Sequence, residues 1–131
     1  MAKKRILIVE DEMMIAEVVK TYLLKDRYEI IDIIDSGEKC LEIVEETNPD
    51  LVIMDIMLAG EMTGVEAAKI VHEKFGTAIL FLTAYADEET LEGAIDSDPY
   101  GYLVKPVREK DVRAAVKMAF HMIQKEQNEK Q

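Results

Sequence analysis

The alternation of short aliphatic runs with segments of helical periodicity most constrains what this chain can fold into. Four runs rich in Ile, Val and Leu occur at residues 6–9, 29–34, 51–54 and 78–82. A fifth run, at residues 100–104, has a weaker pattern and ends at Pro106. Nearly continuous aliphatic runs are typical of strands that are buried on both faces of a parallel sheet. We therefore predict five strands.

The segments between these runs have apolar residues three and four positions apart, as one face of a helix requires. The first such segment contains Ile15, Val18, Val19, Tyr22 and Leu23. Local signals predict further helix boundaries: a start at Ser36, a stop at Asn48-Pro49, and a capping box formed by Thr63 and Glu66.

The last helix is predicted over about residues 108–126, and the polar residues 124–131 are expected to fray. Its predicted buried stripe consists of Val112, Ala115, Val116, Ala119 and Ile123. The stripe recurs at helical spacing, so this helix is expected to pack along its length on the sheet.

Five strand–helix units with short connections predict a doubly wound α/β fold, in which helices cover both faces of a five-stranded parallel sheet. A length of 131 residues fits a single domain. We expect a core over residues 5–124, with residues 125–131 forming a polar tail or the start of a linker. The pattern alone leaves the strand order open.

Composition excludes several classes of partner and site. The net charge of −11 repels phosphate backbones, so no direct contact with nucleic acid is expected. The single cysteine, Cys40, excludes an internal disulfide and a cysteine zinc site. No run approaches the ~18 apolar residues of a spanning helix, so we expect no membrane insertion and a cytoplasmic, unprocessed protein.

Polar residues follow the predicted strands at the edge where open α/β sheets place their sites. Each has a simpler interpretation by itself, such as a helix-start acid, a turn cap or a solvated lysine. The carboxyl ends of parallel strands share one edge of the sheet. We therefore expect the polar residues that follow the strands to lie together there: Glu10, Asp11, Glu12, Asp55, Thr83 and Lys105.

These residues lie within longer motifs, which resemble the receiver domain of two-component response regulators over residues 5 to about 124. The motifs are Val9-Glu-Asp-Glu12, Leu51-Val-Ile-Met-Asp-Ile-Met-Leu58, Gly64, Leu82-Thr-Ala84 and Gly101-Tyr-Leu-Val-Lys-Pro106. The resemblance implies the flavodoxin-like strand order 2-1-3-4-5, which makes the first and third strands neighbours.

Crowded carboxylates at one sheet edge repel one another, and a hard divalent cation relieves that repulsion. The resemblance implies that this cation is Mg²⁺. Its direct ligands would be Asp11, Asp55 and the backbone carbonyl of Met57, and Glu10 would act through water.

The resemblance further implies that Asp55 receives a phosphoryl group from a sensor histidine kinase or a phosphotransfer protein. Lys105 and Thr83 would contact the phosphoryl oxygens, and the Lys105-Pro106 bond would be cis. In many receivers the loop that follows the phosphorylated Asp contains Met-Pro, whereas residues 58–64 here contain no proline. This departure concerns the stiffness of the loop.

Thr83 and Tyr102 are the expected switch pair, although Tyr102 also has the simpler interpretation of a core aromatic. In the switch interpretation, phosphorylation changes the face made by the fourth helix, fifth strand and fifth helix. An output protein or a second copy would bind there. Met13 and Met14 have two open interpretations, as core residues or as contacts for a kinase or phosphotransfer helix.

As a switch, the protein is expected to catalyse only its own phosphorylation and dephosphorylation and to be no enzyme otherwise. Two other classes of function remain as alternatives. A Mg²⁺-dependent phosphohydrolase of the haloacid dehalogenase type would need a second acid two residues after its nucleophile, where this chain has Met57. A phosphorylation-independent interaction module would not need residues capable of binding the metal and the phosphoryl group at every one of the positions named above.

Overall fold

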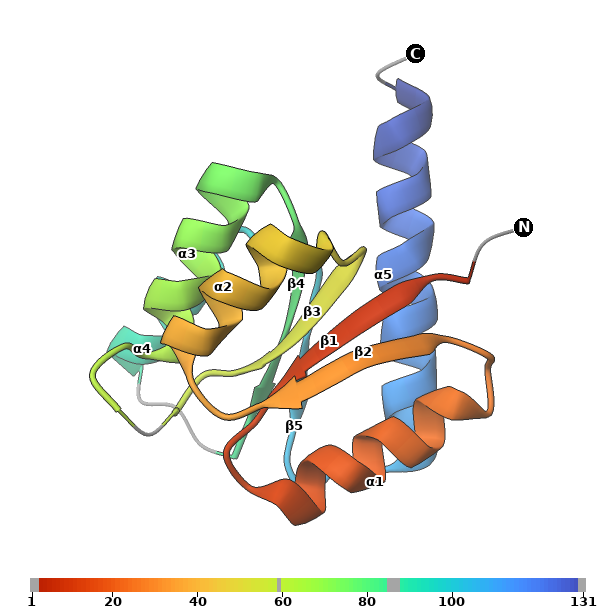
Figure 1. Ribbon diagram of the computed structural model, residues 1–131, viewed down its shortest axis with the longest axis horizontal. Coiled ribbons are helices and arrows are strands. Elements are labelled where there is room, and N and C mark those ends of the chain that lie inside the picture. Colours follow the sequence, from red (N-terminus) through yellow and green to blue (C-terminus); the bar gives the residue numbers. More distant parts are fainter. Residues whose placement is uncertain (1–2, 59, 85–87, 130–131) are drawn as a thin grey trace.

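Strands and helices alternate along the chain in the computed structural model, which describes residues 3–58, 60–84 and 88–129 (Figure 1). The strands are β1 Arg5–Val9, β2 Glu29–Ile34, β3 Leu51–Asp55, β4 Ala78–Thr83 and β5 Tyr102–Val104. The helices are α1 Met13–Leu24, α2 Gly37–Thr47, α3 Gly64–Phe75, α4 Glu88–Asp96 and α5 Glu109–Glu129. No helix within the described ranges has the length and apolar character that crossing a membrane requires.

The strands of the described ranges form one parallel sheet in the order β2-β1-β3-β4-β5, which confirms the predicted order. Their register brings the carboxyl ends level: Val9 of β1 pairs with Met54 of β3, and Thr83 of β4 pairs with Val104 of β5. Side chains that follow the strands therefore meet at one edge of the sheet.

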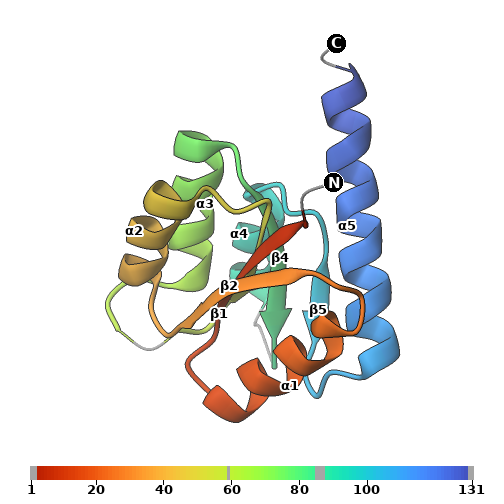
Figure 2. The same ribbon diagram turned by 45° about the vertical axis from the view of Figure 1, so that its right-hand side comes forward.

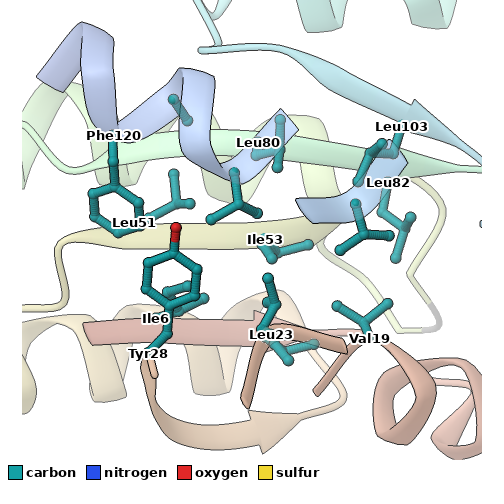
Figure 3. Close-up of a cluster of buried hydrophobic side chains, with 14 of the residues drawn as sticks. Ile6, Val19, Leu23, Tyr28, Leu51, Ile53, Leu80, Leu82, Leu103 and Phe120 are labelled. Atoms are coloured by element: carbon teal, nitrogen blue, oxygen red, sulfur yellow. The ribbon is translucent and has the colours of Figure 1, made fainter. Parts of the chain in front are cut away.

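Helices cover both faces of the sheet, as predicted, with α1 and α5 on one face and α2, α3 and α4 on the other (Figures 1 and 2). Alternate strand residues enter two hydrophobic clusters, because successive side chains of a strand point to opposite faces. Ile6 and Ile53 pack with α1 and α5, whereas Leu7 and Met54 pack with α2 and α3. At one end of the first cluster the rings of Tyr28 and Phe120 stack, with centroids 5.3 Å apart (Figure 3).

Two predictions of burial are wrong. β2 is an edge strand, and only Ile34 among its residues is buried. Val18 of α1 is 41% exposed, although its spacing placed it on the apolar stripe. The fifth strand also begins at Tyr102 rather than at residue 100, because Tyr100 precedes the paired segment.

The predicted helix boundaries on α2 and α3 are confirmed. The Ser36 side chain accepts a hydrogen bond from the backbone N–H of Lys39, and Asn48 ends α2 in the left-handed conformation. Thr63 and Glu66 form the capping box at the start of α3. These caps satisfy backbone groups that the helix ends leave without partners.

Helix α5 continues to Glu129, beyond the predicted end at about residue 126. The fraying of residues 124–131 stays a prediction. The helix projects past the sheet at the end opposite to the carboxyl ends of the strands (Figure 1). The hydroxyl of Tyr100 donates a hydrogen bond to Glu126, which ties this part of α5 to the body of the domain.

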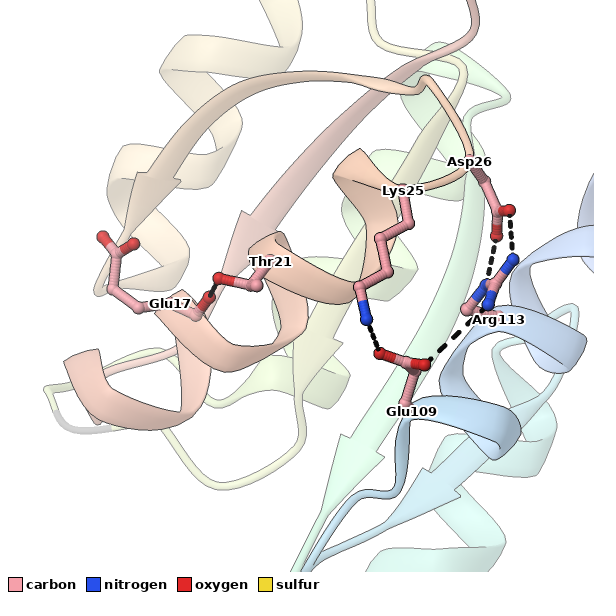
Figure 4. Close-up of polar contacts among 6 residues, drawn as sticks. All are labelled: Glu17, Thr21, Lys25, Asp26, Glu109 and Arg113. Carbon is pink, nitrogen blue, oxygen red and sulfur yellow. Dashed lines mark hydrogen bonds and ion pairs between the residues drawn. The ribbon is translucent and has the colours of Figure 1, made fainter.

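A polar network ties the end of α1 to the start of α5 (Figure 4). The Arg113 guanidinium donates two hydrogen bonds to the Asp26 carboxylate, at 2.9 and 2.7 Å. Lys25 pairs with Glu109, which lies 3.8 Å from Arg113. This network holds together the two helices on that face of the sheet.

Candidate functional site

Three carboxylates meet where β1 and β3 end, as their places after the strands predicted. Ligand-type oxygens of Glu10, Asp11 and Asp55 all lie within 4.8 Å of one another. Glu10 and Asp55 are buried, and Asp11 is half-buried. The adjacency of β1 and β3 in the sheet brings these residues together from positions 44 residues apart, from Asp11 to Asp55.

Lys105 enters the same cluster from the end of β5. Its side chain is 8% exposed, and its Nζ lies 2.6 Å from Glu10 Oε1 and 3.2 Å from Asp55 Oδ2. Glu12 is a more distant partner, at 3.7 Å, and the sequence interpretation gave it no role. The Lys105-Pro106 peptide bond is cis, the geometry that the resemblance implies.

The electrostatics of the cluster follow from burial and close charges. Burial raises the pKa of Glu10 above its usual range, and the neighbouring Asp55 adds to the rise while the Lys105 ammonium opposes it. Burial alone would lower the pKa of Lys105, but its ion pairs with Glu10 and Asp55 outweigh burial and raise it. The lysine therefore stays charged and offsets part of the negative charge.

The backbone after β3 folds closely around Asp55. The Met57 N–H donates a hydrogen bond to Asp55 Oδ1 at 3.0 Å, so the two carboxylate oxygens have different partners. The Gly64 N–H donates to the Ile56 carbonyl at 3.0 Å and closes the β3–α3 loop, residues 56–63. Met57 itself is 60% exposed at the mouth of the site.

Thr83 and Tyr102 lie in contrasting environments. Thr83 is buried, and its hydroxyl has no hydrogen-bond partner among the residues that the structure describes. A buried hydroxyl without a partner is costly and is expected to bind an incoming polar group. Tyr102 is 57% exposed, so its interpretation as a core aromatic is wrong.

The cluster fits a hard divalent cation. Its donors are carboxylate oxygens, which Mg²⁺ prefers over the softer nitrogen and sulfur ligands. Three carboxylates against one ammonium leave an excess of negative charge in a buried place, which a bound cation would neutralise.

The comparisons with known proteins agree with this geometry. Residues 6–117 match the response regulator receiver domain family. The chain belongs to this family. The receiver is 34% identical over 116 residues to the transcriptional regulatory protein PdtaR of Mycobacterium tuberculosis, covering 88% of the receiver and 56% of PdtaR. The receiver spans about half the length of the curated relatives it matches.

Solved structures show the same fold. The signal receiver domain of a modulated diguanylate cyclase from Desulfovibrio desulfuricans G20 superposes with a TM-score of 0.89 at 32% identity, covering 95% of this receiver and 99% of that chain. A CheY-like receiver from Methanospirillum hungatei JF-1 gives a TM-score of 0.88 at 28% identity, with coverages of 95% and 99%. Receivers of this family act as signalling switches rather than as metabolic enzymes.

Sequence reasoning missed the surroundings of this site. An apolar groove of about 510 Å³ lies beside Lys105, between the start of α1 and the β5–α5 connection. Glu38 of α2 also reaches the β3–α3 loop and accepts a hydrogen bond from the Met62 N–H at 3.0 Å. These residues lie 24 positions apart with no shared motif, so no sequence signal could have found the contact.

Proposed function

We propose that this receiver is a phosphoacceptor switch in which Asp55 takes a phosphoryl group from a histidine kinase or phosphotransfer protein. The observation that carries the proposal is the Lys105 ammonium 3.2 Å from Asp55 Oδ2, inside a buried cluster of three carboxylates. The cation beside the acceptor provides positive charge where phosphoryl oxygens arrive, which is the main requirement of this reaction.

In the proposed step, an Asp55 carboxylate oxygen forms a bond to phosphorus while the bond from phosphorus to the donor breaks. The leaving atom, a histidine nitrogen or an acetate oxygen, takes the electron pair. Lys105 binds one phosphoryl oxygen, and the Thr83 hydroxyl, buried without a partner among the described residues, donates to another. Asp55 then carries an acyl phosphate.

Asp11, Asp55 and the Met57 backbone carbonyl would hold Mg²⁺ directly, with Glu10 acting through water. The bound cation supplies charge neutralisation for the phosphoryl oxygens. Glu10 also pairs with Lys105 in this structure, so it positions the lysine as well.

The groove beside Lys105 suits the donor protein. It is lined by Met14, Ile15, Val18, Ala84, Pro106 and Val107, together with Glu12 and Lys105. Met14 is 85% exposed, and exposed methionines adapt to the surface of a partner helix. A donor helix in this groove would present its phosphohistidine to Asp55, which favours the interpretation of Met14 as a docking residue.

Output would leave through the α4–β5–α5 face, defined by the exposed residues Ile95, Tyr102, Val104, Met118 and Met122. Movement of Thr83 toward the phosphoryl group and inward rotation of Tyr102 would reshape this face. The partner that binds the reshaped face would be an output domain, a separate protein or a second copy of the chain. PdtaR is a transcriptional regulatory protein, and control of transcription is one such output. The cytoplasmic location stays a prediction.

Acetyl phosphate with Mg²⁺ tests the proposal directly. We expect intact-mass spectrometry to show one added phosphoryl group on the wild-type protein, and none on Asp55→Asn or after EDTA. Hydroxylamine should remove the adduct, because it attacks acyl phosphates. An adduct that survives hydroxylamine, or that forms equally on Asp55→Asn, contradicts the proposal.

The same preparation separates the switch from a phosphohydrolase. The position two after Asp55 is Met57, whose side chain cannot transfer a proton. We expect no multiple turnover on a phosphate ester such as p-nitrophenyl phosphate, and sustained turnover would favour the hydrolase instead.

A further inference from the structure

The β3–α3 loop connects the acceptor to the next helix, and its described residues, 56–58 and 60–63, belong to no helix or strand. It contains no proline, and Gly60 within it has a φ of +105°, a conformation that L side chains rarely adopt. Its Met57 supplies the N–H that donates to Asp55 Oδ1. The position of this loop therefore sets the position of a donor to the acceptor carboxylate.

A hydrogen bond from another element holds the far half of the loop. The Glu38 carboxylate, in the first turn of α2, accepts from the Met62 N–H at 3.0 Å. The Ser36 cap orients this turn of α2 through its bond from Lys39. Glu38 thus reaches the loop from a helix end that is itself fixed.

Packing reinforces the hydrogen bond. The side chain of Met62 lies directly over Gly37, where an added Cβ would be only 3.0 Å from Met62 Cγ and 3.1 Å from Ala67 Cβ. Met62 also packs against the buried cluster between α2, α3 and the sheet. Gly37 leaves the space that Met62 occupies, so the two residues and Glu38 form one contact, called here the loop clamp.

We infer that the loop clamp, made of Gly37, Glu38 and Met62, positions Asp55 for phosphorylation by holding the Met57 N–H against its carboxylate. This inference rests on the proposed function of Asp55. Among the described residues, the hydrogen-bond partner of Glu38 is the Met62 amide rather than the acceptor or Lys105. It is a positioning residue, since it would act on the site through the loop segment that joins Met57 to Met62.

Three variants of α2 separate the clamp from a general charge effect. Glu38→Ala removes the acceptor, and Glu38→Gln keeps an acceptor oxygen but removes the charge. Glu45→Ala removes the same charge from an exposed position further along α2. Met62→Ala removes the packed side chain but keeps the backbone hydrogen bond.

We expect Glu38→Ala to speed hydrogen exchange of the Met62 amide and to slow phosphorylation by acetyl phosphate, each by about two- to tenfold, the effect of one lost hydrogen bond. The slowing should appear in the limiting rate, with the melting temperature unchanged. Met62→Ala should also slow phosphorylation, while Glu38→Gln and Glu45→Ala should stay within twofold of wild type.

Every other outcome contradicts either the proposed function of Asp55 or the role of the loop clamp. A wild-type protein that takes no phosphoryl group overturns the proposed function, and the Met62 exchange rate then tests the contact alone. If wild type is phosphorylated and Glu38→Ala reacts at the same rate, the clamp has no role in positioning. If Glu38→Gln or Glu45→Ala is slowed as much as Glu38→Ala, charge and not the clamp controls the rate.

Discussion

At the scale of single residues, Gly64 leaves no room for a side chain beside the backbone of Asp55. A Cβ added there would lie 1.8 Å from the backbone oxygen of Asp55 and 2.8 Å from its carbonyl carbon. Backbone atoms cannot rotate away as a side chain can, so the acceptor strand itself would have to move. Gly93 in α4 contrasts with it, because an added Cβ would make an ordinary 3.6 Å contact with Val65.

These two glycines give a matched pair of predictions. Gly64→Ala should lower the free energy of unfolding by about 1–3 kcal/mol, as overpacking does, and should impair phosphorylation of Asp55. Gly93→Ala should raise the free energy of unfolding by about 0.5–1 kcal/mol, because alanine has the higher helix propensity. Urea denaturation measures both. A Gly64→Ala protein as stable as wild type would contradict the close approach.

At the scale of elements, the junction between α1 and α5 depends on the ion pair of Asp26 with Arg113. The hydrogen bonds from Arg113 lower the pKa of Asp26 below its usual value. A carboxyl group whose pKa is lower in the folded state stabilises the fold above its unfolded pKa of about 3.9. That contribution is lost as the pH falls through the lowered pKa of the folded protein.

Asp26→Asn should therefore reduce the melting temperature at pH 7, and the difference from wild type should shrink as the pH falls below about 4. Thermal melts between pH 7 and pH 3 measure this difference. Glu73→Gln on α3 is the control, since it removes a carboxylate from an exposed position and should show little effect at either pH. A constant difference across the whole range would show that the ion pair does not set the stability of this junction.

At the scale of the whole molecule, two surfaces share the sheet: the acceptor edge and the α4–β5–α5 face. Lys105 directly follows β5, and β5 itself carries Tyr102 and Val104, so one short strand contributes to both surfaces. Under the proposed function, a change at Asp55 would therefore reach the exposed face through β5. The exposed methionines of α5 extend that face along the helix.

Phosphorylation should therefore increase association through this face, either with a second copy or with an output protein. We expect sedimentation of the phosphorylated protein to show self-association or tighter binding of its target, and Met118→Lys to weaken that binding about tenfold by placing a charge in an apolar contact. Ile70→Lys on α3 makes the same kind of change outside the face and should have no effect. Unchanged sedimentation, together with unchanged amide shifts over residues 88–124, would argue against this route.

Local signals were enough to predict much of the fold. The five strands, the Ser36 and Thr63 caps and the stop at Asn48 follow from neighbouring residues, since periodicity and backbone capping act over a few positions. The meeting of Glu10, Asp11, Asp55 and Lys105 followed from one further rule, that parallel strands present their carboxyl ends at a single edge.

The sequence by itself determined the sheet, its helices and the set of residues at its carboxyl edge. Only the tertiary structure decided which apolar residues are exposed, such as Val18 and Tyr102, and which distant groups meet, such as Glu38 and Met62. The reason is physical: burial depends on what covers a residue, and the covering groups come from parts of the chain far away in sequence. For the same reason β2, an edge strand, is less buried than its aliphatic run indicated.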